Sequence, residues 1–212
     1  MKSGMIIYFI AFLVFISCTD PERENKNNYF PLREGNVWRF RDTEKDLYSD
    51  EVLSIETTYQ RIIGDSLHSI NNYTNYYYIL FDTADSSKIL LRKDDDYLWA
   101  VIDRIDMDIL FKVSKLELFI FDFWSSFPDI SPFGTVDVYG KCLAESTLAI
   151  GDNVFEDCMC IELRREVSSS VAVDDTLWMW FAPEIGPVRY ESEDIVSGTR
   201  SIRELTNYTL VD

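Results

Sequence analysis

Short stretches of β-prone residues, each closed by a turn signal, recur along the chain and constrain its fold more than any other feature. In the clearest of them, Thr176–Phe181, strict alternation places both tryptophans on one face. Leu177, Met179 and Phe181 share the other face. Turn signals such as Gly64-Asp65 separate the stretches, and no convincing helix of three or more turns interrupts them. The sequence therefore predicts a mainly β fold, a curved antiparallel sheet or partial barrel with few short helices.

The beginning of the chain has the layout of a bacterial lipoprotein signal. Lys2 precedes an apolar run, Met5–Ile16, that is shorter than the roughly 20 residues needed to span a bilayer. Small Ser17 and then Cys18 follow the run. We therefore expect 1–17 to be a cleaved signal peptide and Cys18 to carry a stable lipid anchor, palmitate included. The alternative is an ordinary secretory signal with a coincidental cysteine.

The segment that begins with this cysteine, 18–28, contains no large apolar residue and is expected to be a flexible tether. Thr19, rather than Asp, in the position after the cysteine is similar to the pattern of lipoproteins sorted to the outer membrane. Asp20, Glu22 and Glu24 resemble a surface-export signal, although a solvated linker is the simpler interpretation. We predict an outer-membrane lipoprotein of the cell envelope, on the periplasmic face or the cell surface.

Composition indicates one globular domain after the tether, 29–212. Hydrophobic residues make up 47% of the chain and aromatic residues 15%, which is enough for a sizeable core. The net charge of −17 opposes binding to nucleic acid or bare anionic lipid, because both are polyanions. The acidity is compatible with cationic partners, with divalent ions or simply with solubility. The predicted partners are the membrane, through the N-terminal lipid, and an apolar ligand or envelope protein.

Three cysteines remain once Cys18 is assigned to lipidation, an odd number for an oxidising compartment. Cys158 and Cys160 lie two apart on one predicted strand, so their side chains diverge along the same face. Cys142 lies on the preceding predicted strand and could meet either one. A Cys142–Cys160 disulfide and three buried thiols are the two alternatives, and the spacing does not fit a zinc site.

Two blocks of sequence resemble known envelope proteins. The first is the opening Phe30-Pro31-Leu32 with Gly35-Asn36-Val37-Trp38, and the second joins Gly151 and Phe155-Glu156-Asp157-Cys158 to Trp180–Val188. Together they are similar to the TapB-like and DUF3108-like periplasmic proteins, whose sheets resemble the half-barrels of the lipoprotein carriers LolA and LolB. The resemblance implies a curved antiparallel sheet and carries no general activity. The physical roles of these blocks are structural, with Trp38 and Trp180 as core anchors.

Aromatic residues in two apolar stretches could line a ligand cleft. The candidates are Tyr76, Tyr78, Phe119, Phe121 and Phe123. Alternation in a sheet assigns the same residues more simply to the core. A continuous cavity lined by them would distinguish a binder of apolar ligands from a purely structural lipoprotein.

No residue pattern indicates catalysis, a cofactor or a metal. His68, the only histidine, follows Ser66 without a nucleophile motif. The acidic sets 94–96 and Asp103, Asp106 and Asp108 could hold Ca²⁺ but lack the spacing of an EF-hand loop, and an exposed strand explains them equally.

We therefore expect a lipid-anchored, non-catalytic protein that binds or scaffolds an apolar or envelope-derived ligand, or a partner protein. The alternative from another class is a carboxylate-dependent glycan hydrolase, which needs two acids across a cleft.

Overall fold

Twelve β-strands and no helix make up the regular structure of the residues that the computed structural model describes. These are 29–70, 73–84, 86–94, 96–104, 107–115, 123–126, 136–167 and 175–211. The strands are β1 (Val37–Asp46), β2 (Val52–Ile70), β3 (Tyr73–Asp82), β4 (Ser87–Lys93), β5 (Tyr97–Arg104), β6 (Met107–Lys115), β7 (Phe123–Ser126), β8 (Val136–Ile150), β9 (Asn153–Val167), β10 (Asp175–Ala182), β11 (Gly186–Asp194) and β12 (Thr199–Thr209). Over the same ranges, no helix has the length and apolarity to cross a membrane.

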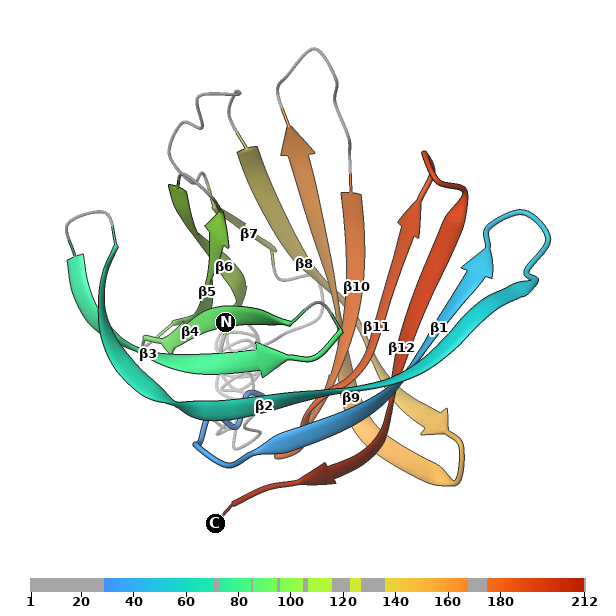
Figure 1. Ribbon diagram of the computed structural model, residues 1–212, viewed down its shortest axis with the longest axis horizontal. Helices are drawn as coiled ribbons and strands as arrows, with labels where there is room; N and C mark the ends of the chain where they lie inside the picture. Colours follow the sequence, from blue (N-terminus) through green and yellow to red (C-terminus); the bar gives the residue numbers. More distant parts are fainter. Residues whose placement is uncertain are drawn as a thin grey trace, which may run out of the picture.

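All twelve strands belong to one antiparallel sheet, in the order β6-β5-β4-β3-β2-β1-β12-β11-β10-β9-β8-β7. β1 pairs with both β2 and β12, so the first and last strands meet in the middle of the sheet. The sheet curls until its edge strand β6 contacts β7 and β8 at the other edge (Figure 1). No ladder joins these edges within the described ranges. The predicted curved antiparallel sheet is confirmed.

The curvature is concentrated in long, irregular strands. β2 is 19 residues long and β8 and β9 are 15 each, and their ladders contain register shifts. The turn predicted at Gly64-Asp65 is wrong, because β2 continues through both residues. Its register against β3 shifts between Ile62 and Asp65, and Gly64 has a φ of 145°. Such an irregularity bends a strand without ending it, which lets β2 wrap around the core.

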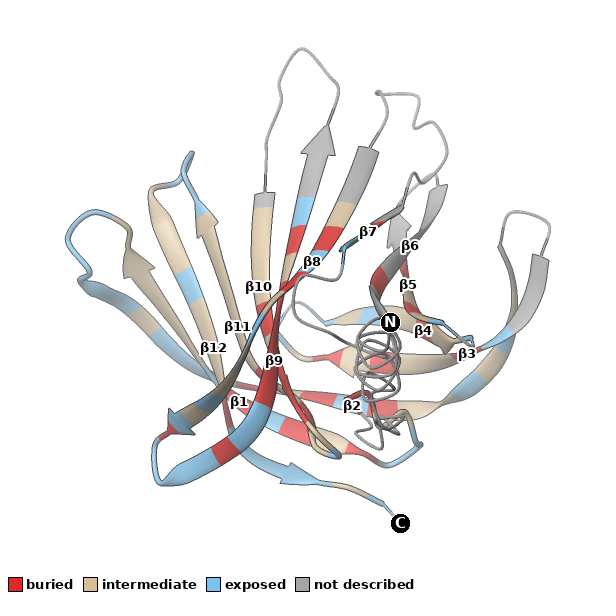
Figure 2. Cartoon of the chain, turned by 180° about the vertical axis from the view of Figure 1, so that it is seen from behind, coloured by how far each residue is buried: buried red, intermediate tan, exposed pale blue. Residues whose placement is uncertain are grey.

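Alternation along β10 separates the two faces of the sheet as predicted. Met179 and Phe181 are buried on the concave face, while Trp178 and Trp180 lie on the convex face. The indole nitrogen of Trp178 donates to Glu162, a residue of β9, at 3.3 Å. The core lies on the concave face and is formed by both halves of the sheet (Figure 2).

The segment before β1 packs against the β10–β11 turn at one end of the sheet. The rings of Phe30 and Phe181 lie 4.6 Å apart between centroids, and Trp38 donates its indole N–H to the Ile185 carbonyl at 2.6 Å. Gly186 has a φ of 96° and lies against Trp38, so glycine is required there for conformation and for close approach. Trp38 is 2% exposed, in agreement with its predicted anchoring role. Trp180, predicted as a second anchor, is only half-buried.

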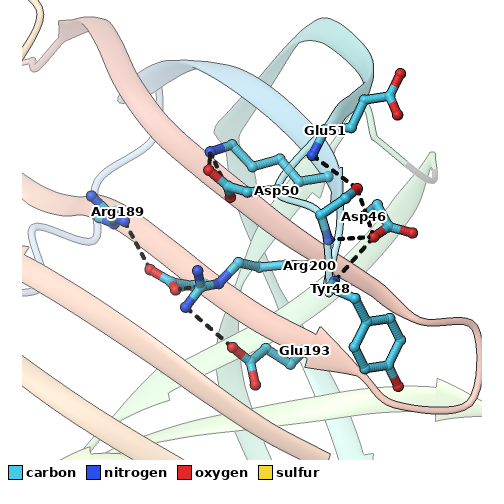
Figure 3. Close-up of polar contacts among 10 residues, drawn as sticks. Asp46, Tyr48, Asp50, Glu51, Arg189, Glu193 and Arg200 are labelled. Carbon is cyan, nitrogen blue, oxygen red and sulfur yellow. Dashed lines mark hydrogen bonds and ion pairs between the residues drawn. The ribbon is translucent and has the colours of Figure 1, made fainter.

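The convex face of β11 and β12 carries a ladder of ion pairs. Arg189 pairs with Glu191 and Glu204, and Arg200 pairs with Glu191 and Glu193. Figure 3 shows the Arg200–Glu193 pair. All of these contacts lie on the side of the sheet opposite the core. Such partly exposed pairs contribute little stability individually, and they keep the convex face polar.

Candidate functional site

The concave face carries a half-open apolar cavity of about 270 Å³ between the two halves of the sheet. Its lining comes from β2 to β6 on one side and from β9 to β11 on the other, and residues 30–32 and Trp38 complete it. Representative lining residues are Leu32, Leu80, Ala100, Leu163, Leu177 and Met179. Polar side-chain atoms in the described lining belong to Gln60, Tyr190 and Trp38, whose indole nitrogen is already bonded to the Ile185 carbonyl. A half-open apolar space of this kind can accept an apolar group.

A larger, polar hollow of about 570 Å³ adjoins this cavity on the same face. Gln60, Ile89, Leu177 and Tyr190 line both spaces, so they form the boundary between them. Beyond the boundary the lining changes to charged and hydroxyl side chains from β1, β2 and β12, among them Asp42, Glu44, Glu56, Ser54, Ser201 and Arg203. The concave face therefore offers an apolar compartment that leads into an acidic one.

Arg203 organises the polar side of the boundary. Its guanidinium donates to both oxygens of Asp42, each at 3.0 Å, and to Asp82 at 2.6 Å. The guanidinium also lies over the rings of Phe40 and Tyr190, at 5.6 and 5.9 Å from their centroids. Burial acts to lower the pKa of Arg203, but the hydrogen bonds and charges of Asp42 and Asp82 outweigh it and raise the pKa.

Gln60 and Tyr190 complete the boundary. The Gln60 amide donates to Asp82 at 2.7 Å and its oxygen accepts from the Tyr190 hydroxyl at 3.2 Å. Gln60 is 5% exposed. Burial raises the pKa of the Tyr190 hydroxyl well above its ordinary value, so the hydroxyl stays protonated as a donor. These polar groups satisfy one another in a fixed arrangement, which suits the positioning of a ligand.

The aromatic candidates within the described residues, Tyr76, Tyr78 and Phe123, do not line the cavity. Tyr76 is 69% exposed and Phe123 is 59% exposed. Tyr76 lies opposite Leu67, which is 56% exposed, in a part of β2 and β3 away from the buried core. On β7, alternation buries Trp124 and turns Phe123 outward. Tyr78 packs against the core without lining the cavity, as in the simpler interpretation.

The remaining two aromatic candidates, Phe119 and Phe121, lie outside the described residues, as does the predicted lipidation site Cys18. The predicted signal peptide and tether also lie outside them.

Cys142, Cys158 and Cys160 are buried thiols, and no disulfide joins them in the structure. The register of β8 against β9 places Cys142 opposite Ile161 and Cys160 opposite Ala144, so the two candidate partners do not face each other directly. Burial raises the pKa of Cys158 to about 11 and that of Cys160 to about 12.

The other candidates for chemistry lie away from the cavity. His68 is within 2.6 Å of the Ser66 hydroxyl and packs edge-on against Tyr77. Asp94 accepts hydrogen bonds from the backbone of Asp96 and Tyr97, so it caps the β4–β5 turn. Over the described ranges, no three His, Cys, Asp or Glu side chains gather as metal ligands would. Asp106 lies outside those ranges.

Sequence reasoning missed the polar side chains at the boundary and beside it: Asp42, Gln60, Asp82, Tyr190 and Arg203. One signal was available, because Asp42 continues the alternation of Trp38 and Phe40 and so places a carboxylate on the core face of β1. Its partners could not be identified in the same way, since they come from strands far apart in the chain.

No known family model and no curated protein matches the chain, so the resemblance to the TapB-like and DUF3108-like proteins is not confirmed. Two solved structures are similar. One is a candidate lipoprotein of Parabacteroides distasonis, 11% identical, with a TM-score of 0.48, covering 86% of this chain and 99% of its own. The other is a candidate exported protein with a YmcC-like fold from Bacteroides fragilis, 13% identical, with a TM-score of 0.48, covering 87% of this chain and 100% of its own. Similarity of this degree supports no conclusion about function.

Proposed function

We propose that this protein is a lipid-anchored envelope protein whose β domain binds an apolar ligand without catalysis. The observation that carries the proposal is the apolar cavity that both halves of the sheet line and that adjoins a polar hollow. Ligand sites in proteins are typically concave, largely apolar and fitted with a few convergent polar groups. Gln60 and Tyr190 are such groups, at the boundary of the two compartments.

The arrangement of the polar groups favours binding over hydrolysis. A glycan hydrolase would need two carboxyl groups facing an open cleft, one as acid and one as base or nucleophile. Asp42 and Asp82, the carboxylates at the boundary, are instead both bound to Arg203. Asp42 accepts a further hydrogen bond from Thr58 at 3.0 Å. The carboxylate oxygens of Asp42 and Asp82 thus bind neighbouring side chains of the sheet.

The cavity can be tested with a fluorescent apolar probe, N-phenyl-1-naphthylamine, added to the full chain. Ala100 is 4% exposed and lines the cavity, so Ala100→Leu places three additional carbon atoms in it. Ala149 is exposed on β8, and Ala149→Leu is the matched control. We expect the unaltered protein and the control to bind the probe and Ala100→Leu to bind at least several-fold more weakly. Equal binding by both variants, or no binding at all, would overturn the proposed cavity ligand.

The anchor is tested separately. Cys18→Ala is expected to leave the domain folded, with an unchanged circular dichroism spectrum, and to release it from membranes. Recovery of this variant in the membrane fraction after a high-salt wash would contradict the lipoprotein assignment. Native mass spectrometry of the unaltered protein, extracted gently from its own membrane, would then show whether a further mass is bound and lost on denaturation.

A further inference from the structure

We infer that the ligand is an amphiphile with a cationic head group, whose tail occupies the apolar cavity and whose head lies in the polar hollow. The inference rests on the proposed function and specifies the class of ligand. The two compartments adjoin at Gln60 and Tyr190, so one molecule can occupy both. The distinction between head groups comes from the charges that line the hollow.

The one cation among the described lining residues is already neutralised. Arg203 forms ion pairs with Asp42 and Asp82, two carboxylates for one guanidinium. Glu191 also lines the hollow, but its carboxylate pairs with Arg189 and Arg200 on the convex face. No cationic side chain in the lining therefore remains to bind an anionic head group.

Two further carboxylates increase the negative charge of the hollow. Glu44 accepts a long hydrogen bond, 3.4 Å, from the neutral Ser54 hydroxyl. Glu56 lies directly opposite Asp42 in the β1–β2 ladder. Like charges at directly opposed positions of a sheet destabilise it. A cation bound in the hollow would relieve this repulsion, whereas a carboxylate or phosphate would add to it.

The geometry also determines where the tail and the head group of the ligand lie. The apolar lining comes from β2 to β6 and from β9 to β11, and the carboxylates lie on β1 and β2 beyond the Gln60–Tyr190 boundary. A tail that enters the cavity therefore leaves its head beside Asp42, Glu44 and Glu56. Part of the binding free energy comes from burying the tail, and the preference between head groups comes from the charges.

Three probes with the same tail separate these contributions: decylammonium, decanol and decanoate. Their dissociation constants for the full chain are measured by isothermal titration calorimetry at low ionic strength and pH 7.5. We expect decylammonium to bind about tenfold or more tightly than decanoate, with decanol between them. The preference should shrink as salt is added, since the hollow is open to solvent.

Charge removal supplies the decisive comparison. Glu44→Gln/Glu56→Gln keeps the shape of the hollow and should bring the decylammonium and decanoate dissociation constants to within about threefold of each other. Glu34→Gln/Glu156→Gln removes two exposed carboxylates elsewhere and should leave the preference unchanged. Equal binding of all three probes, tighter binding of decanoate, or an unchanged preference in Glu44→Gln/Glu56→Gln would overturn the inference and leave the proposed function intact. Failure of all three to bind would overturn both.

Discussion

Arg203 and Asp42, 161 residues apart in the sequence, face each other in the β1–β12 ladder and are joined by two hydrogen bonds of 3.0 Å each. The same guanidinium reaches Asp82 on β3, so one side chain ties three strands together. Because Asp82 is 6% exposed, its carboxylate depends on partners from within the protein.

Removing this guanidinium should destabilise the fold strongly. Arg203→Met retains much of the side-chain volume but leaves two carboxylates without their shared cation, and we expect a loss of about 3 kcal/mol in the free energy of unfolding. Arg41→Met is the matched control, because Arg41 pairs with Glu204 on the convex face and its side chain is 51% exposed. That change should cost about 1 kcal/mol or less. Urea denaturation measures both, and equal losses would contradict the role assigned to Arg203.

Gly140 should tolerate no larger side chain. It lies opposite Trp124 in the β7–β8 ladder, and a Cβ at Gly140 would overlap the indole ring. We expect Gly140→Ala to lower the free energy of unfolding by about 1–3 kcal/mol. In a Trp124→Leu background the same change should cost much less, because the overlap is removed. A cost independent of residue 124 would show that the glycine is needed for another reason.

The buried thiols predict a loss of stability in alkali. Folding raises the pKa of Cys158 to about 11 and that of Cys160 to about 12, from an ordinary value of 9.0. Above pH 9 the unfolded chain therefore releases protons that the folded protein retains, and stability falls as the pH rises. The unfolding free energy of Cys158→Ala/Cys160→Ala should decrease less steeply between pH 8.5 and 10.5 than that of the unaltered protein. Parallel curves would exclude this contribution.

Lys93 predicts a change of stability with pH that is opposite in sign to that of the cysteines. Burial lowers its pKa from 10.5 to about 8, against a smaller, opposing effect of the Glu184 charge. Between pH 8 and 10.5 the unfolded chain binds the additional proton, so this residue's contribution to stability rises with pH. Lys93→Met should be more stable than the unaltered protein at pH 7, by about 1 kcal/mol after allowance for partial solvent screening. The difference should shrink by pH 9.5, and a difference that does not vary with pH would contradict the assignment.

The local pattern of apolar residues and turn signals was sufficient to predict a curved antiparallel sheet. Alternation in Thr176–Phe181 gave the correct faces of β10, because a period of two is imposed by strand geometry and is independent of the partner strands. The same logic failed at Gly64-Asp65, where a glycine followed by an aspartate is equally compatible with a turn and with an irregularity inside a long strand. Which of the two forms depends on the neighbouring strand, and that is tertiary information.

The candidate site was much less accessible to sequence reasoning. Aromatic content directed attention to Tyr76 and Phe123, which are exposed, whereas the cavity is lined mainly by aliphatic residues such as Leu80 and Leu177. The polar boundary is formed by residues from β1, β2, β3, β11 and β12. Only the strand order brings these residues together, and no local motif encodes it.

The pairing of β1 with β12 also determines when the protein can fold. Contacts such as that between Arg41 and Glu204 join positions 163 residues apart, so β1 lacks one of its two neighbours until nearly the whole described chain has emerged. The other ladders of the described sheet join strands that are consecutive in the chain, so β1 exposes an unpaired strand edge until β12 arrives. During synthesis, the segment from β1 to β6 therefore has an open strand edge at β1 until β12 has emerged, and an unpaired edge of this kind favours aggregation.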